Sequence, residues 1–246
     1  MPRSGIMMQA IIIIGGHNSL WPAYLKMARD LEDLSGLQAI GVPLMPWHWW
    51  TAGRSNNASN LLHKVQETVI WARRKFKADQ FILVGHSAGG VVARLYLHEG
   101  PVWGHVYGGV EHVHSVITLG SPHCSDRNGD IGWMLADQAN RLVPGTPYSA
   151  RVRYRAVMGK HLRGNKSGNH RERRAFRTYQ FFTGQGDVWG DGIVPIQSAR
   201  LDGAESLLLE GVAHSRKLSG NWYGGSKALI SHWWSACEPP RGPDAN

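Results

Sequence analysis

The chain has 246 residues, 42% of them hydrophobic, which is enough for one well-filled core. The two cysteines, Cys124 and Cys237, are too few for a disulfide framework and lack the paired spacing of a zinc site. Apolar runs fall far short of the roughly 20 residues that a membrane-spanning helix needs, and residues 1–8 lack the cleavage site of a signal peptide. We therefore expect a single domain in the cytoplasm.

The N-terminal third alternates the patterns of strands and helices. Four isoleucines at residues 11–14 run into two glycines, which is typical of a strand buried on both faces and stopped by a turn. Apolar residues at helical spacing follow over residues 24–34. A second strand is predicted at 37–42, and a second helix at 59–76 with Ser59 as its N-cap.

The alternation continues further along the chain. Five more segments are predicted: strands at 81–84, 115–119 and 206–209, and helices at 91–98 and 226–234. This order predicts an α/β fold with a mostly parallel central sheet and helices on both of its faces. Residues 239–246 are expected to form a frayed tail.

Between residues 123 and 180 the pattern weakens, with only a short helix at 133–141 and a strand at 152–158 expected. Irregular inserts of this length are usually functional or mobile, so we predict a cap inserted into the single domain at about 123–180. Arg and Lys are concentrated at residues 151–177 and contribute to a formal net charge of +9. A solvated basic face is the commonest use of such a run, and contact with an anionic membrane is an alternative. No nucleic-acid-binding motif accompanies the charge, so we expect no nucleic-acid partner.

The strongest motif is Gly-x-Ser-x-Gly at residues 85–89, placed between an apolar strand and a helix. Such a turn exposes the serine hydroxyl, and the glycines let the strand and helix backbones pass close together. We predict Ser87 to be a nucleophile. The alternative is a glycine-rich turn that contains an incidental serine.

A serine hydroxyl needs a base and an acid that orients the base, in the chain order serine, acid, histidine. Asp191 stands between two glycines and His214 follows an apolar strand, so both fit that order. Asp187 is an alternative acid, although its loop position is less easily exposed at a strand end. The rival histidines each have a plain structural role as an alternative: His17, His86, His123 and His232.

Acyl transfer also needs backbone donors that face the developing oxyanion. These are normally the N–H after the nucleophile and an N–H from the loop after an early strand. The sequence predicts Ala88 and His17 for these two positions. A simple tight turn is the alternative for the second of them.

Taken jointly, the motifs resemble those of the lipase-like α/β-hydrolases, and within them the cyanobacterial and plant proteins grouped with the PGAP1-like lipases. Six segments across most of the chain carry the resemblance: residues 15–17, 85–90, 118–123, 186–195, 212–215 and 222–224. It implies a serine esterase or lipase that acts on acyl lipids without a cofactor, with Ser87, Asp191 and His214 as its triad. Two features depart from the family pattern, a Gly15-Gly16 pair where His-Gly is usual and the Arg-rich insert at 160–177.

The sequence marks the residues that would bind the substrate less specifically. Trp47, Trp49 and Trp50 follow the second strand, where loops border the cleft of such folds, so we assign them with His86 to substrate binding. Core packing is the alternative for the tryptophans. No metal-ligand spacing is visible. Because a fold does not fix its chemistry, an acyltransferase and a catalytically silent lipid-binding or interaction module remain alternatives to an ester hydrolase.

Overall fold

The computed structural model of the protein describes residues 8–124 and 131–234, and the side chains of 131–133 are not described. The expectations for residues 1–7, for Cys237 and for the tail at 239–246 lie outside these ranges. Six parallel strands form the central sheet in the order β10-β7-β6-β3-β1-β2. Their bounds are β1 Gln9–Ile14, β2 Gln38–Gly41, β3 Gln80–His86, β6 Val113–Leu119, β7 Arg153–Lys160 and β10 Glu205–Glu210.

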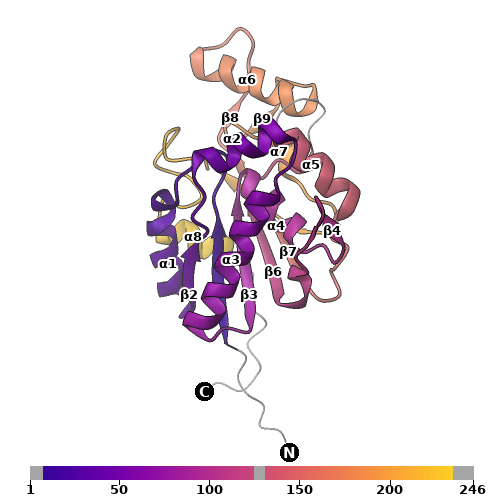
Figure 1. Ribbon diagram of the computed structural model, residues 1–246. Helices are drawn as coiled ribbons and strands as arrows, with labels where there is room; N and C mark the ends of the chain where they lie inside the picture. The colour runs from indigo at the N-terminus through magenta and orange to yellow at the C-terminus, as the bar shows by residue number, and fades with distance from the viewer. Residues whose placement is uncertain (1–7, 125–130, 235–246) are drawn as a thin grey trace, which may run out of the picture.

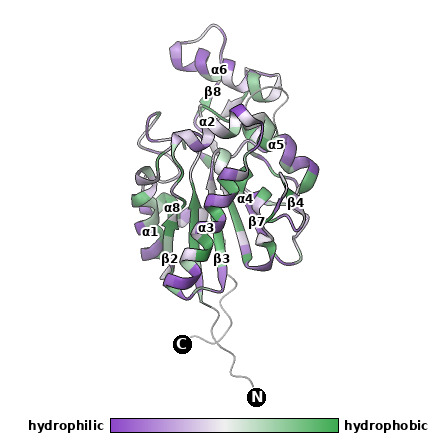
Figure 2. Ribbon diagram, in the orientation of Figure 1, coloured by the Kyte–Doolittle hydropathy of each residue, from purple (hydrophilic) through white to green (hydrophobic). Residues whose placement is uncertain are grey.

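Helices cover both faces of this sheet, as Figure 1 shows. The alternate isoleucines of β1 explain why, because Ile12 and Ile14 pack in one apolar cluster while Ile11 and Ile13 pack in another. The first cluster includes α3 (Ser59–Phe76), α4 (Ala88–Tyr96) and α5 (Ile131–Leu142), and the second includes α1 (Leu25–Ser35) and α8 (Lys227–Trp234). Figure 2 shows the same division, with hydrophobic strands at the centre and hydrophilic residues on the outer helix surfaces. The predicted α/β class is confirmed.

Several elements differ from the predictions. Residues Pro46–Ser55 form a helix, α2, where no element was expected. Ser59 does not cap α3, because Ala58 is the N-cap and the Asn57 side chain accepts the Ser59 N–H. Short elements were also not predicted: η1 Trp21–Tyr24, β4 Pro101–Val102, β5 His105–Val106, η2 Gly109–Glu111, β8 Leu162–Arg163, β9 Trp189–Gly190 and α7 Ile196–Ala199.

The Arg- and Lys-rich stretch at residues 151–177 runs into α6 (His170–Thr183), which projects beyond the carboxyl end of the sheet in Figure 1. The Asn169 side chain accepts two backbone N–H groups of the first turn, and Glu172 accepts the Asn169 N–H in return. This capping box starts the helix, and Gly184 at φ 70° ends it. The same Arg- and Lys-rich stretch also contains β7, which belongs to the central sheet.

The order of the strands positions the site. From β1 the chain moves to one side to form β2 and then returns to form β3 on the other side. The carboxyl ends of β1 and β3 therefore flank the point where the order reverses, which is where open α/β sheets bind their ligands. In the described residues, no helix is long and apolar enough to cross a membrane.

Candidate active site

Ser87 lies in the turn between β3 and α4, with φ 55° and ψ −132°. A positive φ is uncommon for a residue with a side chain and marks a strained turn. The flanking glycines permit this turn, because an added Cβ at Gly89 would overlap the carbonyl oxygen of Ile14 and one at Gly85 would overlap Gly90. α4 begins directly after the serine, three residues earlier than predicted.

The structure brings Ser87, Asp191 and His214 together from three distant parts of the chain. The His214 Nε2 atom lies 3.0 Å from the Ser87 hydroxyl oxygen, and its Nδ1 atom lies 2.7 Å from Asp191 Oδ2. Asp191 follows β9, and His214 follows β10. A backbone hydrogen bond of 2.8 Å from the His214 N–H to the Asp191 carbonyl also ties the two loops together. This arrangement lets the imidazole accept the serine proton while the carboxylate fixes its orientation.

Asp191 is 1% exposed, and both of its oxygens have donors. Oδ1 accepts the backbone N–H groups of Ile193 and Val194 at 3.0 and 2.8 Å, while Oδ2 accepts the Tyr223 hydroxyl at 3.0 Å besides His214. Burial and the neighbouring carboxylate hold the pKa of Tyr223 well above its ordinary value, so this hydroxyl stays a donor. The buried charge is thus compensated and fixed in position.

The alternative acid, Asp187, has no hydrogen bond to His214. Its side chain is exposed, and its carbonyl accepts a hydrogen bond from Arg163 Nε at 3.0 Å. Of the two acids considered, the structure brings only Asp191 to the imidazole.

Three of the rival histidines pack against other side chains or lie at the surface. His123 is buried beside Thr118 and Arg94, and His232 is exposed on α8. The ring of His17 packs edge-on against Trp49 at 5.6 Å between centroids.

His86 is buried, and both of its ring nitrogens have partners. Its Nε2 lies 2.8 Å from the carbonyl oxygen of His214, and its Nδ1 lies 2.8 Å from the Tyr24 hydroxyl. Burial, followed by the nearby His214, lowers the pKa of His86 to about 3, so the ring is neutral at physiological pH. A carbonyl only accepts, so Nε2 carries the hydrogen and Nδ1 accepts from Tyr24, whose hydroxyl in turn accepts the Gly16 N–H at 3.0 Å.

The two predicted oxyanion donors occupy neighbouring segments. Ala88 is the first residue of α4, where a helix leaves its N–H groups without intrahelical partners. The loop after β1 lies against the serine, since an added Cβ at Gly16 would fall 2.7 Å from Ser87 Cβ. His17 is the next residue of that loop.

The predicted substrate-binding residues divide by exposure. Trp49 is 1% exposed and His86 is buried, whereas Trp47 and Trp50 on α2 are 52% and 58% exposed. Only Trp47 and Trp50 are thus available to a ligand at the surface. Across residues 8–124 and 131–234, no three His, Cys, Asp or Glu side chains gather as a metal site.

Sequence reasoning did not find three tyrosines around the site. Tyr223 contacts Asp191, and Tyr24 contacts His86. The Tyr179 hydroxyl on α6 accepts the Gly192 N–H at 2.8 Å and donates to the Leu162 carbonyl at 3.0 Å. The position of Tyr223 within the noted segment 222–224 is the one sequence signal for any of these roles.

Comparisons with known proteins agree with the fold. Residues 55–130 match the family model of the PGAP1-like alpha/beta domain, while no curated protein matches the sequence. The mature form of the Bacillus licheniformis lipase BlEst2 is similar in structure, with a TM-score of 0.59 and 19% identity over 91% of each chain.

Two more solved structures are similar at lower identity. Phospholipase PlaB from Legionella pneumophila has a TM-score of 0.58 and 10% identity over 95% of this chain, which spans 61% of that protein. An alpha-beta serine hydrolase homologue from Coxiella burnetii has a TM-score of 0.50 and 13% identity over 94% of this chain and 85% of its own. The chain therefore has the α/β-hydrolase fold, in a form similar to that of these lipases and hydrolases.

Proposed function

We propose that the protein is a serine carboxylic-ester hydrolase that acts on acyl lipid esters. The observation that carries this proposal is that His214 lies within hydrogen-bond distance of both Ser87 and Asp191. In the proposed reaction His214 takes the Ser87 proton as the hydroxyl oxygen attacks the ester carbonyl. The N–H groups of Ala88 and His17 stabilise the tetrahedral oxyanion, and His214 then protonates the departing alcohol. Water repeats these steps on the acyl-enzyme and releases the acid.

The electrostatics around His214 support this cycle. When the imidazole becomes positively charged, the buried carboxylate of Asp191 stabilises it at 2.7 Å. The ring of His86 lies 4.8 Å away between centroids, and a charge there would oppose protonation of His214. Because the pKa of His86 is lowered to about 3, that ring stays neutral and adds no repulsion.

Three observations favour lipid esters as the substrate class. Two of the similar structures are a lipase and a phospholipase. Trp47 and Trp50 expose large aromatic surfaces on α2, and such rings suit a lipid–water boundary. Helix α6, rich in arginine, lies at the same end of the molecule as α2 in Figure 1. We propose that this end of the protein contacts anionic membranes.

Fluorophosphonate labelling with peptide mapping, together with hydrolysis of p-nitrophenyl esters, tests the proposal. We expect the label on Ser87, and loss of both label and turnover in Ser87→Ala. Ser55→Ala, at an exposed serine of α2, serves as the control that keeps both. An unlabelled wild type, or hydrolysis that survives Ser87→Ala, would overturn the proposal in favour of a binding module. Product analysis with an added alcohol separates hydrolysis from acyl transfer.

A further inference from the structure

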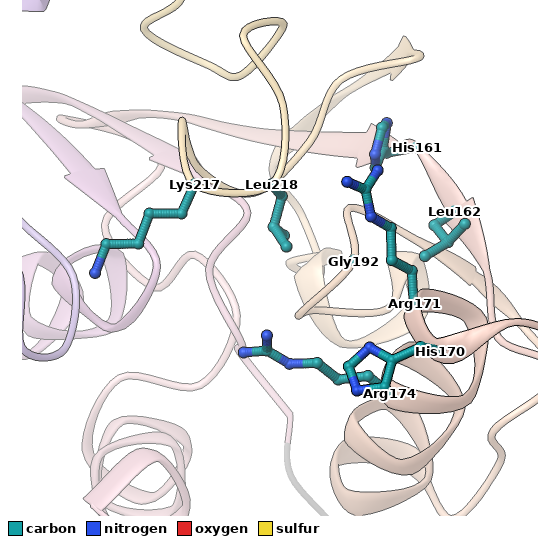
Figure 3. Close-up of a pocket in the computed structure, with 8 residues that line it drawn as sticks. All are labelled: His161, Leu162, His170, Arg171, Arg174, Gly192, Lys217 and Leu218. Carbon is teal, nitrogen blue, oxygen red and sulfur yellow. The ribbon is translucent and has the colours of Figure 1, made fainter.

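A cavity of about 180 Å³ lies between α6 and the loops that follow Asp191 and His214. Its lining includes five basic side chains: His161, His170, Arg171, Arg174 and Lys217. None of the described residues that line it is acidic. Figure 3 shows Arg171 and Arg174 leaving α6 on the side of the cavity, while Lys217 and Leu218 come from the opposite loop.

The cations of this cavity have no counterion in the part of the chain that the structure describes. Among the described residues, the side chains of Arg171, Arg174 and Lys217 form no ion pair and no hydrogen bond, unlike Arg173 of the same helix, which donates to the Gly168 carbonyl. Glu172, which follows Arg171 in the chain, does not line the cavity and accepts the Asn169 N–H in the capping box. Asp191, which precedes Gly192, is buried and already has four donors. Like charges that line one cavity repel one another, so an anion placed between Arg171 and Arg174 would be stabilised.

The cavity adjoins the candidate active site. Gly192 lines it and directly follows Asp191, so their Cα atoms are about 3.8 Å apart. On the other side Leu218 lines it, in the loop that begins at His214, and donates its N–H to the Ser215 carbonyl. An added Cβ at Gly192 would lie 3.0 Å from Leu218 Cδ1, which shows how closely the two loops meet. The cavity is thus bordered by the two loops that hold the candidate acid and the candidate base.

The helix that supplies the arginines is held in place. Its capping box fixes the N-terminus, and Tyr179 bonds it to the Gly192 N–H and the Leu162 carbonyl. His170 and Arg171 belong to the first turn of α6, where the helix dipole also favours an anion. The backbone from which the arginines extend is thus fixed before any ligand binds, which reduces the ordering cost of binding.

We propose that this cavity binds a phosphate group carried by the ester substrate. The inference rests on the proposed function, because the phosphate is taken to belong to the molecule whose ester Ser87 attacks. A phosphate monoester fits better than a carboxylate, since its charge at neutral pH approaches −2 and its three oxygens can each accept from a different cation. The arginines also suit phosphate because their planar groups can donate two parallel hydrogen bonds.

Two binding measurements test the cavity itself. Inorganic phosphate is titrated into the wild type and into Arg171→Gln/Arg174→Gln by calorimetry. The matched control is Lys166→Gln/Arg177→Gln, which removes the same charge from exposed positions of the insert that do not line the cavity. We expect the phosphate affinity to fall about tenfold or more in the first variant and to stay within about twofold in the control. Equal affinities in the two variants, or no phosphate binding to the wild type, would overturn the proposal.

A kinetic pair of soluble esters tests the link to the reaction. Glycerol monobutyrate and its 3-phosphate share the same ester, and only the second carries the anion. In Arg171→Gln/Arg174→Gln we expect KM for the phosphate ester to rise about tenfold while kcat/KM for the neutral ester stays unchanged. An equal loss for both esters would show a structural role for the arginines and contradict the proposal.

Vesicles distinguish the two sources of phosphate. If Arg171→Gln/Arg174→Gln weakens binding to phosphatidic acid vesicles but leaves KM for the soluble phosphate ester unchanged, the arginines contact the membrane surface and the substrate site is wrong. The proposed function can fail separately. Phosphate binding that is lost in this variant, in a wild type that hydrolyses no ester, would reject the hydrolase while keeping a phosphate site.

Discussion

His86 donates the hydrogen on Nε2 to the carbonyl oxygen of His214, over 2.8 Å, so the residue before Ser87 holds the backbone of the candidate base. Its Nδ1 atom accepts from Tyr24, which in turn accepts the Gly16 N–H. One chain of hydrogen bonds therefore joins the loop after β1, the serine turn and the histidine loop. His86 was assigned to substrate binding from the sequence, and its burial favours a positioning role.

Replacing His86 with phenylalanine removes both hydrogen bonds and keeps a ring of similar size. We expect kcat to fall about tenfold to a hundredfold with little change in KM, because displacement of a reacting group by an ångström costs about that much. Steady-state kinetics with a p-nitrophenyl ester measures the split. His86→Gln can still donate to the carbonyl of His214, so it should recover part of the loss. A rise in KM alone would return His86 to substrate binding.

The lowered pKa of His86 also affects stability. The folded protein holds this ring neutral down to about pH 3, whereas the unfolded chain protonates it near pH 6.5. Between these pH values the unfolded state binds more protons than the folded state. The contribution of the neutral His86 ring to stability is therefore complete above pH 6.5 and is lost as the pH falls toward 3. As the pH falls through this range, the free energy of unfolding of His86→Gln should decline less steeply than that of the wild type, by up to about 1.4 kcal/mol per pH unit. Denaturant unfolding at several pH values measures the difference. The exposed His232→Gln variant should decline like the wild type.

Tyr223→Phe tests the support of the acid. The change removes a 3.0 Å donor from Asp191 Oδ2 and leaves the carboxylate with less compensation in a buried site. We expect kcat to fall about tenfold, which matches the loss of one hydrogen bond to a charged group. Tyr148→Phe removes a tyrosine hydroxyl from a different part of the molecule and should leave kcat unchanged. Equal kinetics for the two variants would remove Tyr223 from the proposed site.

Gly89→Ala tests the close approach behind the serine turn. Alanine is the better helix former by about 1 kcal/mol, but the added Cβ would overlap the Ile14 carbonyl, which belongs to the backbone and cannot rotate away. We expect the free energy of unfolding to drop by about 3 kcal/mol or more. At Gly220 an added Cβ meets no atom within 4 Å, so Gly220→Ala should change it by less than about 0.5 kcal/mol. Chemical denaturation compares the two.

The sequence predicted the sheet better than the segments added to it. The β1 isoleucines and the turn at Ser87 each combine a strong apolar run with glycines, so pattern and backbone geometry agree. Helix α2 was missed because three tryptophans and two glycine or proline positions in ten residues hide its amphipathic pattern. α6 was missed although its Asn169 and Glu172 form a capping box, because its many arginines obscured the short buried face at Ala175 and Tyr179.

Site prediction had a similar limit. Ser87 and Asp191 each stand next to a strand end or a glycine, and His214 comes four residues after β10, so local pattern and chain order together identify them. Tyr24 and Tyr179 carry no such local signal, because their roles depend on contacts 62 and 13 residues away along the chain. The basic cavity likewise needs α6 to fold back onto the loop at Gly192, which composition alone cannot show.

Contact with membranes predicts a role for the exposed tryptophans of α2. Trp47→Ala/Trp50→Ala should lower binding to anionic vesicles and slow hydrolysis of vesicle lipid, while a soluble p-nitrophenyl ester should be hydrolysed at the same rate. Trp71→Ala is the matched control, since Trp71 is 46% exposed in the half of α3 that leads to the opposite end of the sheet.

Sedimentation with vesicles at rising salt measures how much the basic side chains contribute to membrane binding. This contribution should weaken as the Debye length falls from about 10 Å at 0.1 M toward about 3 Å at 1 M. Vesicle binding that did not change with salt would reject the electrostatic contribution to membrane contact. Vesicle binding that did not change in Trp47→Ala/Trp50→Ala would reject the contribution of the α2 tryptophans.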